Sequence, residues 1–306
     1  MQEKEDLLNS VIEKSQKTIE QSKGWHVKYD TQVNAMLENR TLLDQFKIKR
    51  LTKEYSALQF YLNEISQPDL ITITAKYKGN GIATITITKD TAQISTETYE
   101  KSNKELFNID TKLKNEDLNT IQTHKFLEHF NQDIKLKTKP NKETQESMLL
   151  AEFSKTSSYD KLLTGIQPIK YADTLYYQIP MTIGANPTEY INILARTKVR
   201  KITIVEVLED NQDLDTILAQ ATAKAVFLIN LLHIENGAST YRLMGFHGRL
   251  PNQITIKVCI AVPKSSKIKE FEPFEIQNGI DTLDYRYLQY ENDQEQITSI
   301  KTNVND

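Results

Sequence analysis

The stretch EYINILARTKVRKITIVEVLEDNQDLDTILAQATAKAVFLINLL, residues 189–232, decides the fold. Residues 189–196 and 201–208 are two strand-like runs, and the four residues between them predict a hairpin. The segment 209–215 is rich in aspartate and asparagine, which cap helix starts. It leads into a long apolar helix, which we predict over residues 216–233.

The segments on either side extend this hairpin and helix into an α/β core. Residues 254–262, ITIKVCIAV, form a nearly continuous apolar strand, which is typical of a strand buried on both faces in a parallel arrangement. Residues 143–155 predict a helix before the hairpin. The order helix, hairpin, helix, strand contains a β-α-β crossover, so we predict a central mixed sheet flanked by helices.

The first half of the chain predicts a separate α+β arrangement. Its apolar residues first recur with the helical period and then, after Pro68, alternate with the period of 2 that is typical of strands. The sequence KGNG at residues 78–81 is a hairpin-turn signal inside this alternating region. The expected elements are helices over residues 3–22, 33–65 and 116–130 and strands over residues 70–77, 82–88 and 91–98.

A composition change near residue 140 predicts the boundary between two domains. The chain has only 9 glycines and 8 prolines, and most of them lie beyond residue 140. Residues 132–145, QDIKLKTKPNKETQ, are polar and rich in lysine, which favours a linker. We therefore predict an α+β domain of unknown role over residues 1–140 and an α/β domain over residues 141–306.

Composition excludes several classes of protein. The 306 residues include 38 basic and 41 acidic side chains, so the net charge of −3 excludes a globally basic nucleic-acid binder but not a local basic surface. A single cysteine, Cys259, excludes an internal disulfide and a cysteine-based zinc cluster. We find neither an apolar export signal nor a membrane-length apolar run, so we expect a cytoplasmic protein, bacterial in style, that does not enter a membrane.

The second half resembles the core of the PD-(D/E)XK nuclease-like superfamily. The resemblance rests on INILAR, then ITIVEVLEDN, then AQATAKAVFLINLL, and it covers about residues 143–290. In that family the first hairpin strand carries a metal-binding aspartate, the second carries a glutamate and a lysine as E-h-K, and a helix with Q-x-x-x-Y often follows. The resemblance implies a restriction-endonuclease-like fold and Mg²⁺- or Mn²⁺-dependent phosphodiester hydrolysis.

The signature residues agree with the family pattern only in part. Asn192 stands at the position of the aspartate, Glu206 at that of the glutamate and Leu208 at that of the lysine. Asparagine offers a neutral carbonyl oxygen where the family has a carboxylate, and leucine offers no charge, so we expect weak metal affinity. The metal ligands that the resemblance implies are Glu206 and Asn192, with Glu152, or alternatively Glu146, from the preceding helix.

The following helix offers a replacement for the missing lysine. Gln220 matches the family glutamine, and Lys224 stands where the tyrosine is common. The two residues share a helical face because they are four positions apart. Two readings of Lys224 stay open, an ammonium near Glu206 and a surface lysine, and the candidate catalytic residues are Glu206, Lys224 and Gln220.

The hairpin turn and a later loop carry further polar groups. Arg196, Lys198, Arg200 and Lys201 are either phosphate contacts or a solvated turn. His247, in the glycine-flanked sequence GFHGR, is better explained as a loop histidine than as a site residue.

Three functions are compatible with these patterns. The first is a catalytically degenerate nuclease-like domain that is retained for binding DNA or another nucleic acid. The second is an active, divalent-metal-dependent DNA nuclease that uses Glu206 with Lys224. The third is a protein-interaction scaffold whose N-terminal domain recruits a protein partner without nucleic acid, and a homo-oligomer is compatible with all three. Asn192 and Leu208 favour the first and third functions over the second.

Overall fold

The computed structural model describes residues 2–63, 65, 69–132, 134–135, 142–155, 165–181, 189–197, 199–209, 212–292 and 296–304. The chain forms two compact units that alternate along the sequence. Unit 1 comprises Met1–Asp30, Leu149–Ile169 and Gln178–Asp306, and unit 2 comprises Thr31–Met148 and Lys170–Tyr177. The division into independent domains at residue 140 stays a prediction, and residues 136–141 of the expected linker lie outside the described residues.

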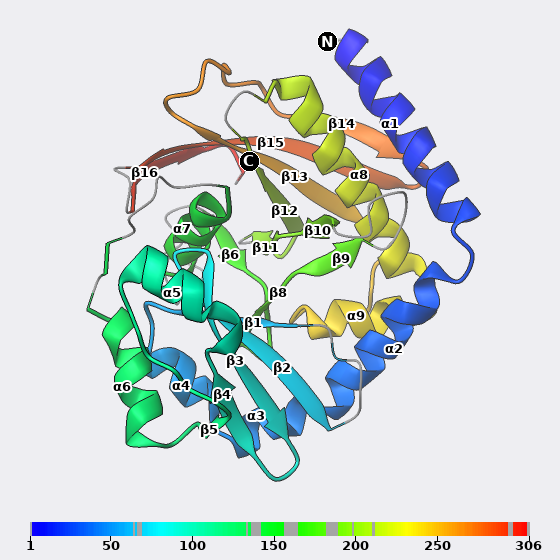
Figure 1. Ribbon diagram of the computed structural model, residues 1–306. Helices are drawn as coiled ribbons and strands as arrows, with labels where there is room; N and C mark the ends of the chain where they lie inside the picture. The colour runs from blue at the N-terminus through cyan, green and yellow to red at the C-terminus, as the bar shows by residue number, and fades with distance from the viewer. Residues whose placement is uncertain are drawn as a thin grey trace. The chain divides into compact units, whose positions relative to one another are not determined.

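Unit 1 is built on a mixed sheet. Its strands follow the order β14-β15-β13-β12-β11-β6, with β16 paired to β15 (Figure 1). The bounds are β6 Ile166–Pro168, β11 Ile193–Thr197, β12 Ile202–Val207, β13 Thr255–Pro263, β14 Phe274–Asn278, β15 Asp281–Asn292 and β16 Ile297–Thr302. A separate antiparallel pair joins β9, Ile179–Met181, to β10, Glu189–Ile191.

The predicted hairpin and crossover are both present in this sheet. Strands β11 and β12 pair antiparallel, and β12 pairs parallel to β13 after passing through helix α8, Leu214–His233. Every residue of β12 is buried, as are all but the first and last residues of β13, because neighbouring strands lie on both sides and other elements cover both faces. The interior position of β12 is what brings its one acidic side chain into the core.

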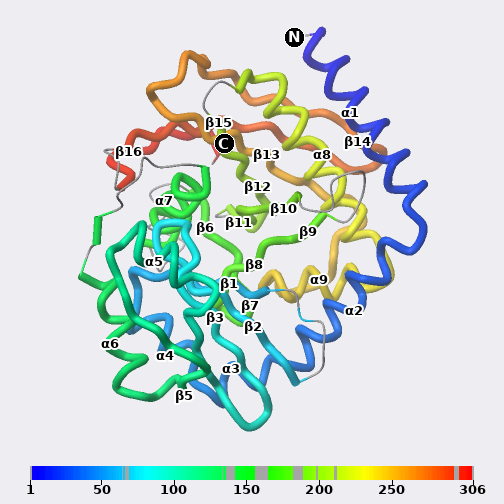
Figure 2. Tube along the Cα trace, viewed as in Figure 1, coloured from blue at the N-terminus to red at the C-terminus, as the bar shows by residue number. Residues whose placement is uncertain are grey.

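Helix α8 covers one face of the unit 1 sheet. It packs on β12, β13 and β15, and α1, Gln2–Gln21, packs against it (Figures 1 and 2). Asp213 caps the start of α8 by accepting a hydrogen bond from the backbone N–H of Thr216 at 2.7 Å, and this bond lowers the pKa of the Asp213 carboxyl. Helix α9, Gly237–Leu243, follows α8 and has no counterpart among the predicted elements.

Helix α8 is also long and apolar enough to cross a membrane when only its length and composition are counted. In the structure 67% of its most apolar window is buried inside the protein. The core helix of a soluble protein passes the same test, so this helix is weak evidence for a membrane span.

Unit 2 contains the second sheet. Its strands follow the order β5-β4-β3-β2-β1-β8-β7. The bounds are β1 Gln59–Leu62, β2 Leu70–Tyr77, β3 Asn80–Thr88, β4 Ala92–Ser95, β5 Glu116–Asp117, β7 Lys170–Tyr171 and β8 Leu175–Tyr177. The three-stranded meander predicted from the alternating sequence is confirmed as β2, β3 and β4. The short helices are α3 Arg40–Gln45, α4 Ile48–Glu54, α5 Glu100–Phe107 and α6 Ile121–Phe130, with a 3-10 turn at Glu97–Tyr99.

Two helices contribute to both units. Helix α2, Trp25–Glu38, begins in unit 1 and ends in unit 2, and helix α7, Lys142–Ser154, runs from unit 2 into unit 1. Helix α7 matches the helix that the sequence predicts over residues 143–155.

The prediction of one long helix over residues 33–65 is wrong. The chain instead forms the end of α2, then α3 and α4, and finally strand β1. A left-handed backbone at Lys47, with φ of 54°, separates α3 from α4. Strand β1 is central to its sheet, because it pairs with β2 on one side and β8 on the other. The apolar residues at the end of the predicted helix fit a buried strand as well as a helix, and pairing with distant strands decided between them.

Candidate functional site

Glu206 and Lys224 meet in the core of unit 1. Glu206 lies on β12, and its side chain points to the face of the sheet that α8 covers. The Lys224 ammonium donates a hydrogen bond to Glu206 Oε2 at 2.7 Å. Only 9% of the Lys224 side chain and 4% of the Glu206 side chain are exposed. Glu206 and Lys224 are therefore in direct contact as a buried ion pair.

Two opposing free-energy contributions, the loss of hydration and the mutual attraction of the charges, determine how much the ion pair stabilises the fold. Each charge loses its hydration when it is buried, at a cost of several kcal/mol per ion, and the mutual attraction at 2.7 Å offsets this cost. A buried pair of this kind adds little net stability, but removal of one partner leaves an uncompensated charge. The pair therefore holds α8 against β12 in one arrangement.

Asn192 directly precedes β11, whose first residue, Ile193, pairs with Val205, the neighbour of Glu206 on β12. The side-chain oxygen of Asn192 accepts a hydrogen bond from Gln178 Nε2 at 3.0 Å. Leu208, which stands where the family has its lysine, is buried and apolar. Of the three family positions, only Glu206 carries a charge.

The remaining predicted site residues have partners of their own. Gln220 is exposed on α8 and accepts a hydrogen bond from Gln212 Nε2 at 2.8 Å. Glu152 on α7 pairs with Lys155 at 2.5 Å. Glu146, the alternative helix carboxylate, is buried in unit 2, whereas Glu152 belongs to unit 1.

These side chains do not form a site that fits a divalent cation. Mg²⁺ and Mn²⁺ prefer several oxygen ligands, mainly carboxylates and water. Glu206 supplies the one carboxylate among the three family positions, and the Lys224 ammonium lies against it. Among the described residues, no group of three or more histidine, cysteine, aspartate or glutamate side chains is placed to hold a metal ion. Metal binding stays a prediction of the sequence resemblance.

The turn between β11 and β12 holds exposed cations in a defined conformation. The backbone N–H of Arg200 donates to the carbonyl of Thr197 at 2.9 Å, and the N–H of Lys201 donates to Thr197 Oγ1 at 3.1 Å. Arg200 has a left-handed backbone with φ of 60°, which is uncommon for a residue with a side chain. Arg200 and Lys201 are both exposed, and Lys198 lies outside the described residues. The turn therefore presents a pair of cations from a closed, hydrogen-bonded loop.

Arg196 ties this turn to the segment that follows α9. Its Nε donates to Gln167 Oε1 at 3.2 Å on β6, and its Nη1 donates to the carbonyl of Gly245 at 3.2 Å. Burial raises the pKa of Tyr241, and the Arg200 charge partly opposes this rise. The predicted cations Arg196 and Arg200 thus lie beside α9, which the sequence did not predict.

Unit 2 contains a cluster of tyrosine and lysine side chains that the sequence does not predict. The rings of Tyr61 on β1 and Tyr176 on β8 lie 5.3 Å apart, and the two residues are paired across parallel strands. Lys76 lies 4.3 Å from the Tyr61 ring and Lys170 lies 4.4 Å from the Tyr176 ring. Burial lowers the pKa of Lys76, and nearby Glu146 partly opposes this shift. Tyr61 and Tyr176 are 115 residues apart in the chain, and no local signal predicts their pairing.

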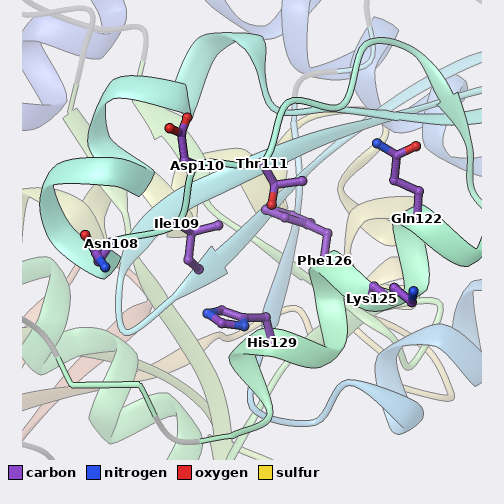
Figure 3. Close-up of a pocket in the computed structure, with 8 residues that line it drawn as sticks. All are labelled: Asn108, Ile109, Asp110, Thr111, Gln122, Lys125, Phe126 and His129. Carbon is purple, nitrogen blue, oxygen red and sulfur yellow. The ribbon is translucent and has the colours of Figure 1, made fainter.

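Unit 2 also has a surface depression of about 350 Å³ (Figure 3). One wall is the face of α6 that carries Gln122, Lys125, Phe126 and His129, and the other is the segment 108–111. Ile109 and Phe126 form its apolar floor, and its charged side chains are exposed at the rim. Water solvates these exposed groups, so the depression has the polarity of an ordinary surface hollow.

No family model, curated protein or solved structure matches the chain. The resemblance to PD-(D/E)XK nucleases therefore rests on the residues of the sequence.

Proposed function

We propose that the chain binds nucleic acid through unit 1, on a PD-(D/E)XK-like scaffold whose catalytic residues have been replaced. The observation that carries this proposal is the turn between β11 and β12. Within the described part of the chain, neither Arg200 nor Lys201 pairs with a carboxylate, although acidic residues outnumber basic ones in the whole chain. Exposed cations that are left for a partner and held in a closed turn are suited to phosphate contacts.

The residues in the core of unit 1 support the proposal that the scaffold has lost its catalytic residues. The order of α7, the β11–β12 hairpin, α8 and β13 agrees with the order that the resemblance implies. Asparagine, glutamate and leucine occupy the three signature positions, and the glutamate is neutralised by Lys224. An ammonium at 2.7 Å competes with any divalent cation for the same carboxylate oxygen. We therefore expect the scaffold to bind nucleic acid without requiring Mg²⁺ or Mn²⁺.

Binding to labelled duplex DNA, single-stranded DNA and RNA, measured by fluorescence anisotropy at several salt concentrations, tests this function. We expect the affinity to fall steeply as salt rises, because counterions are released from the neutralised phosphates. The variant Arg200→Glu/Lys201→Glu should bind at least about tenfold more weakly and should show a salt slope smaller by about 1 for each cation replaced.

The matched control is Lys14→Glu/Lys17→Glu, which makes the same charge change at exposed positions of α1. The control should bind nucleic acid nearly as well as the wild type. Equal losses in both double variants would show that only overall charge matters, and that would refute a site at the turn. Absence of wild-type binding to all three nucleic acids would overturn the function and favour the protein-interaction scaffold.

The position of Lys224 beside Glu206 leaves a second candidate, an active nuclease, in which a divalent cation would have to displace the ammonium from the carboxylate. In this reading the ammonium on α8 replaces the family lysine and stabilises negative charge that develops on a phosphate oxygen. The experiment is incubation of plasmid and single-stranded DNA with the wild type and with Glu206→Gln in Mg²⁺ or Mn²⁺. Cleavage by the wild type that is lost in Glu206→Gln would support this candidate, and no cleavage by the wild type with either metal would refute it.

A further inference from the structure

We infer that the loop Gly245-Phe246-His247-Gly248-Arg249, together with the end of α9, is a second contact for the same nucleic acid. This inference rests on the proposed function and extends the surface at the β11–β12 turn. We call the combined surface the turn–loop surface. Its residues are Arg196, Arg200 and Lys201 from the hairpin and Arg242, His247 and Arg249 from α9 and its loop.

The loop is fixed against the hairpin by contacts that glycine makes possible. Gly245 accepts the hydrogen bond from Arg196, and its φ of +76° lies in the left-handed region. A Cβ atom at this position would lie 3.2 Å from Arg196 Nη1. The close approach of the guanidinium therefore favours glycine at residue 245.

An aromatic anchor holds the next residue of the loop. Phe246 is buried, and its ring stacks on Tyr241 at a centroid distance of 4.6 Å and an interplanar angle of 12°. The hydrogen bond from Arg196 to Gly245 joins the hairpin to the loop, and the Tyr241–Phe246 stack joins the loop to α9, so these segments are held together.

The residues beyond the anchor are directed to solvent. His247, Gly248 and Arg249 are exposed, as is Arg242 on α9. In the described part of the chain, Arg242 and Arg249 form no ion pair with a carboxylate. The turn and the loop that is anchored by the Tyr241–Phe246 stack therefore both present exposed cations.

This arrangement favours an extended polyanion over a single phosphate group. The turn and the loop are separate segments of the chain, and each presents exposed cations, Arg200 and Lys201 on the turn and Arg242 and Arg249 on α9 and its loop. A nucleic-acid strand carries a phosphate at every nucleotide and can contact both segments at once. We therefore assign a polynucleotide, contacted through its backbone, to the turn–loop surface.

The test compares three double variants by anisotropy with one labelled DNA oligonucleotide at two salt concentrations. Arg242→Gln/Arg249→Gln should lower the affinity at least about fivefold and reduce the salt slope by about 1 for each cation removed. Arg200→Gln/Lys201→Gln should give a similar loss, and the control Lys14→Gln/Lys17→Gln should leave binding within about twofold of the wild type.

A length series and a vesicle assay complete the test. Inorganic phosphate and a dinucleotide should compete poorly with the labelled DNA, whereas unlabelled DNA of about twenty nucleotides should compete well. Equal competition per phosphate by inorganic phosphate would overturn the polyanion assignment. Binding to vesicles of an anionic phospholipid without binding to DNA would overturn both the inference and the proposed function.

The outcomes separate this inference from the proposed function. Loss of binding in the Arg200/Lys201 variant, with wild-type binding in the Arg242/Arg249 variant, would refute the second contact while the function stands. If the wild type binds no nucleic acid, the function itself fails. Thermal unfolding of each variant checks that the substitutions leave the fold intact.

Discussion

Strand β12 and the turn before it carry two kinds of charge within the six residues from Lys201 to Glu206, and the different surroundings of these charges separate structure from function. Lys201, directly before the strand, is exposed with Arg200 in the turn. Glu206, near the end of the strand, is buried and bonded to Lys224. Burial forces a charge to find a partner inside the protein, because the loss of hydration must be offset. Exposure imposes no such demand, so the turn cations remain available to an external anion.

The opposite face of the same sheet also holds buried charges that pair with one another. Asp284 on β15 accepts bonds from Arg286 at 2.6 and 3.1 Å, and Lys257 on β13 lies 3.9 Å away. Lys257 and Arg286 also donate to the backbone carbonyls of Val304 and Asn303 near the end of the chain. The side chains of this cluster alternate with those on the face covered by α8. Both faces therefore hold buried charges through internal partners.

The largest effect should come from breaking the Glu206–Lys224 pair. We expect Glu206→Ala to lower the free energy of unfolding by about 3–5 kcal/mol, because it leaves the Lys224 ammonium buried without its carboxylate. Urea denaturation at neutral pH measures the change. The control Glu206→Leu/Lys224→Met replaces both charges by apolar groups and should lose far less. A loss below about 1 kcal/mol in the single variant would contradict the buried pair.

A smaller loss should follow from the isosteric change Asp284→Asn. The amide keeps the shape of the carboxylate, but it weakens the charge-assisted bonds from Arg286, so we expect a loss of about 1.5–3 kcal/mol. Urea denaturation measures this loss as well. The control is Asp90→Asn, which makes the same chemical change at an exposed position. Equal stability of the two variants would show that the cluster on this face does not stabilise the sheet.

Substitutions in the turn between β11 and β12 should weaken binding but leave stability nearly unchanged. We expect Arg200→Glu/Lys201→Glu to change the free energy of unfolding by no more than about 0.5 kcal/mol, since both side chains are exposed. The same variant should weaken nucleic-acid binding, as set out above. Denaturation and anisotropy measurements on one protein sample therefore test this difference. Stability should respond to Glu206 inside β12, and binding should respond to the turn before it. A large loss of stability here would mean that the turn is structural.

Another small effect concerns Lys76 in unit 2, and this effect depends on pH. Because burial lowers the pKa of Lys76 in the folded protein, the unfolded chain binds a proton that the folded chain lacks between this lowered pKa and the ordinary value of 10.5. The contribution of Lys76 to the free energy of unfolding therefore rises with pH between its lowered pKa and 10.5, and it is smallest at pH values below the lowered pKa. We expect Lys76→Met to be stabilising at neutral pH, by less than about 1 kcal/mol because the contact with the Tyr61 ring is lost.

Thermal unfolding of Lys76→Met and the wild type from pH 7 to pH 10.5 measures this dependence. The advantage of the variant should shrink as the pH approaches 10.5. Lys170→Met is a matched comparison, because Lys170 makes the same kind of contact with Tyr176. An advantage that grows with pH would contradict the assigned direction of the Lys76 shift.

Local sequence patterns predicted the elements that depend on nearby residues. The β11–β12 hairpin, α8, β13 and the meander β2–β4 follow from apolar periodicity and from turn and cap residues. The sequence left open whether Lys224 lies near Glu206 or on the surface, and the structure has its ammonium 2.7 Å from the Glu206 carboxylate. The C-terminal strands β14, β15 and β16 and helix α9 were not predicted.

The elements that sequence reasoning missed depend on distant contacts. Strand β1 has apolar residues that suit a helix or a strand, and its pairing with β2 and β8 selected the strand. The Tyr61–Tyr176 contact and the hydrogen bond from Arg196 to Gly245 join residues far apart in the chain. Neither contact leaves a local signature, so only the folded chain reveals them.

The sequence by itself thus determined the α/β character of the second half, the alternating strands of the first, and the mismatched signature at Asn192, Glu206 and Leu208. These features follow from residue chemistry and from spacing within one element. The tertiary structure decided that Lys224 lies 2.7 Å from Glu206 and that α9 and its loop lie beside the cationic turn. Such contacts depend on which faces pack together, and packing is settled by burial over the whole unit rather than by any one segment.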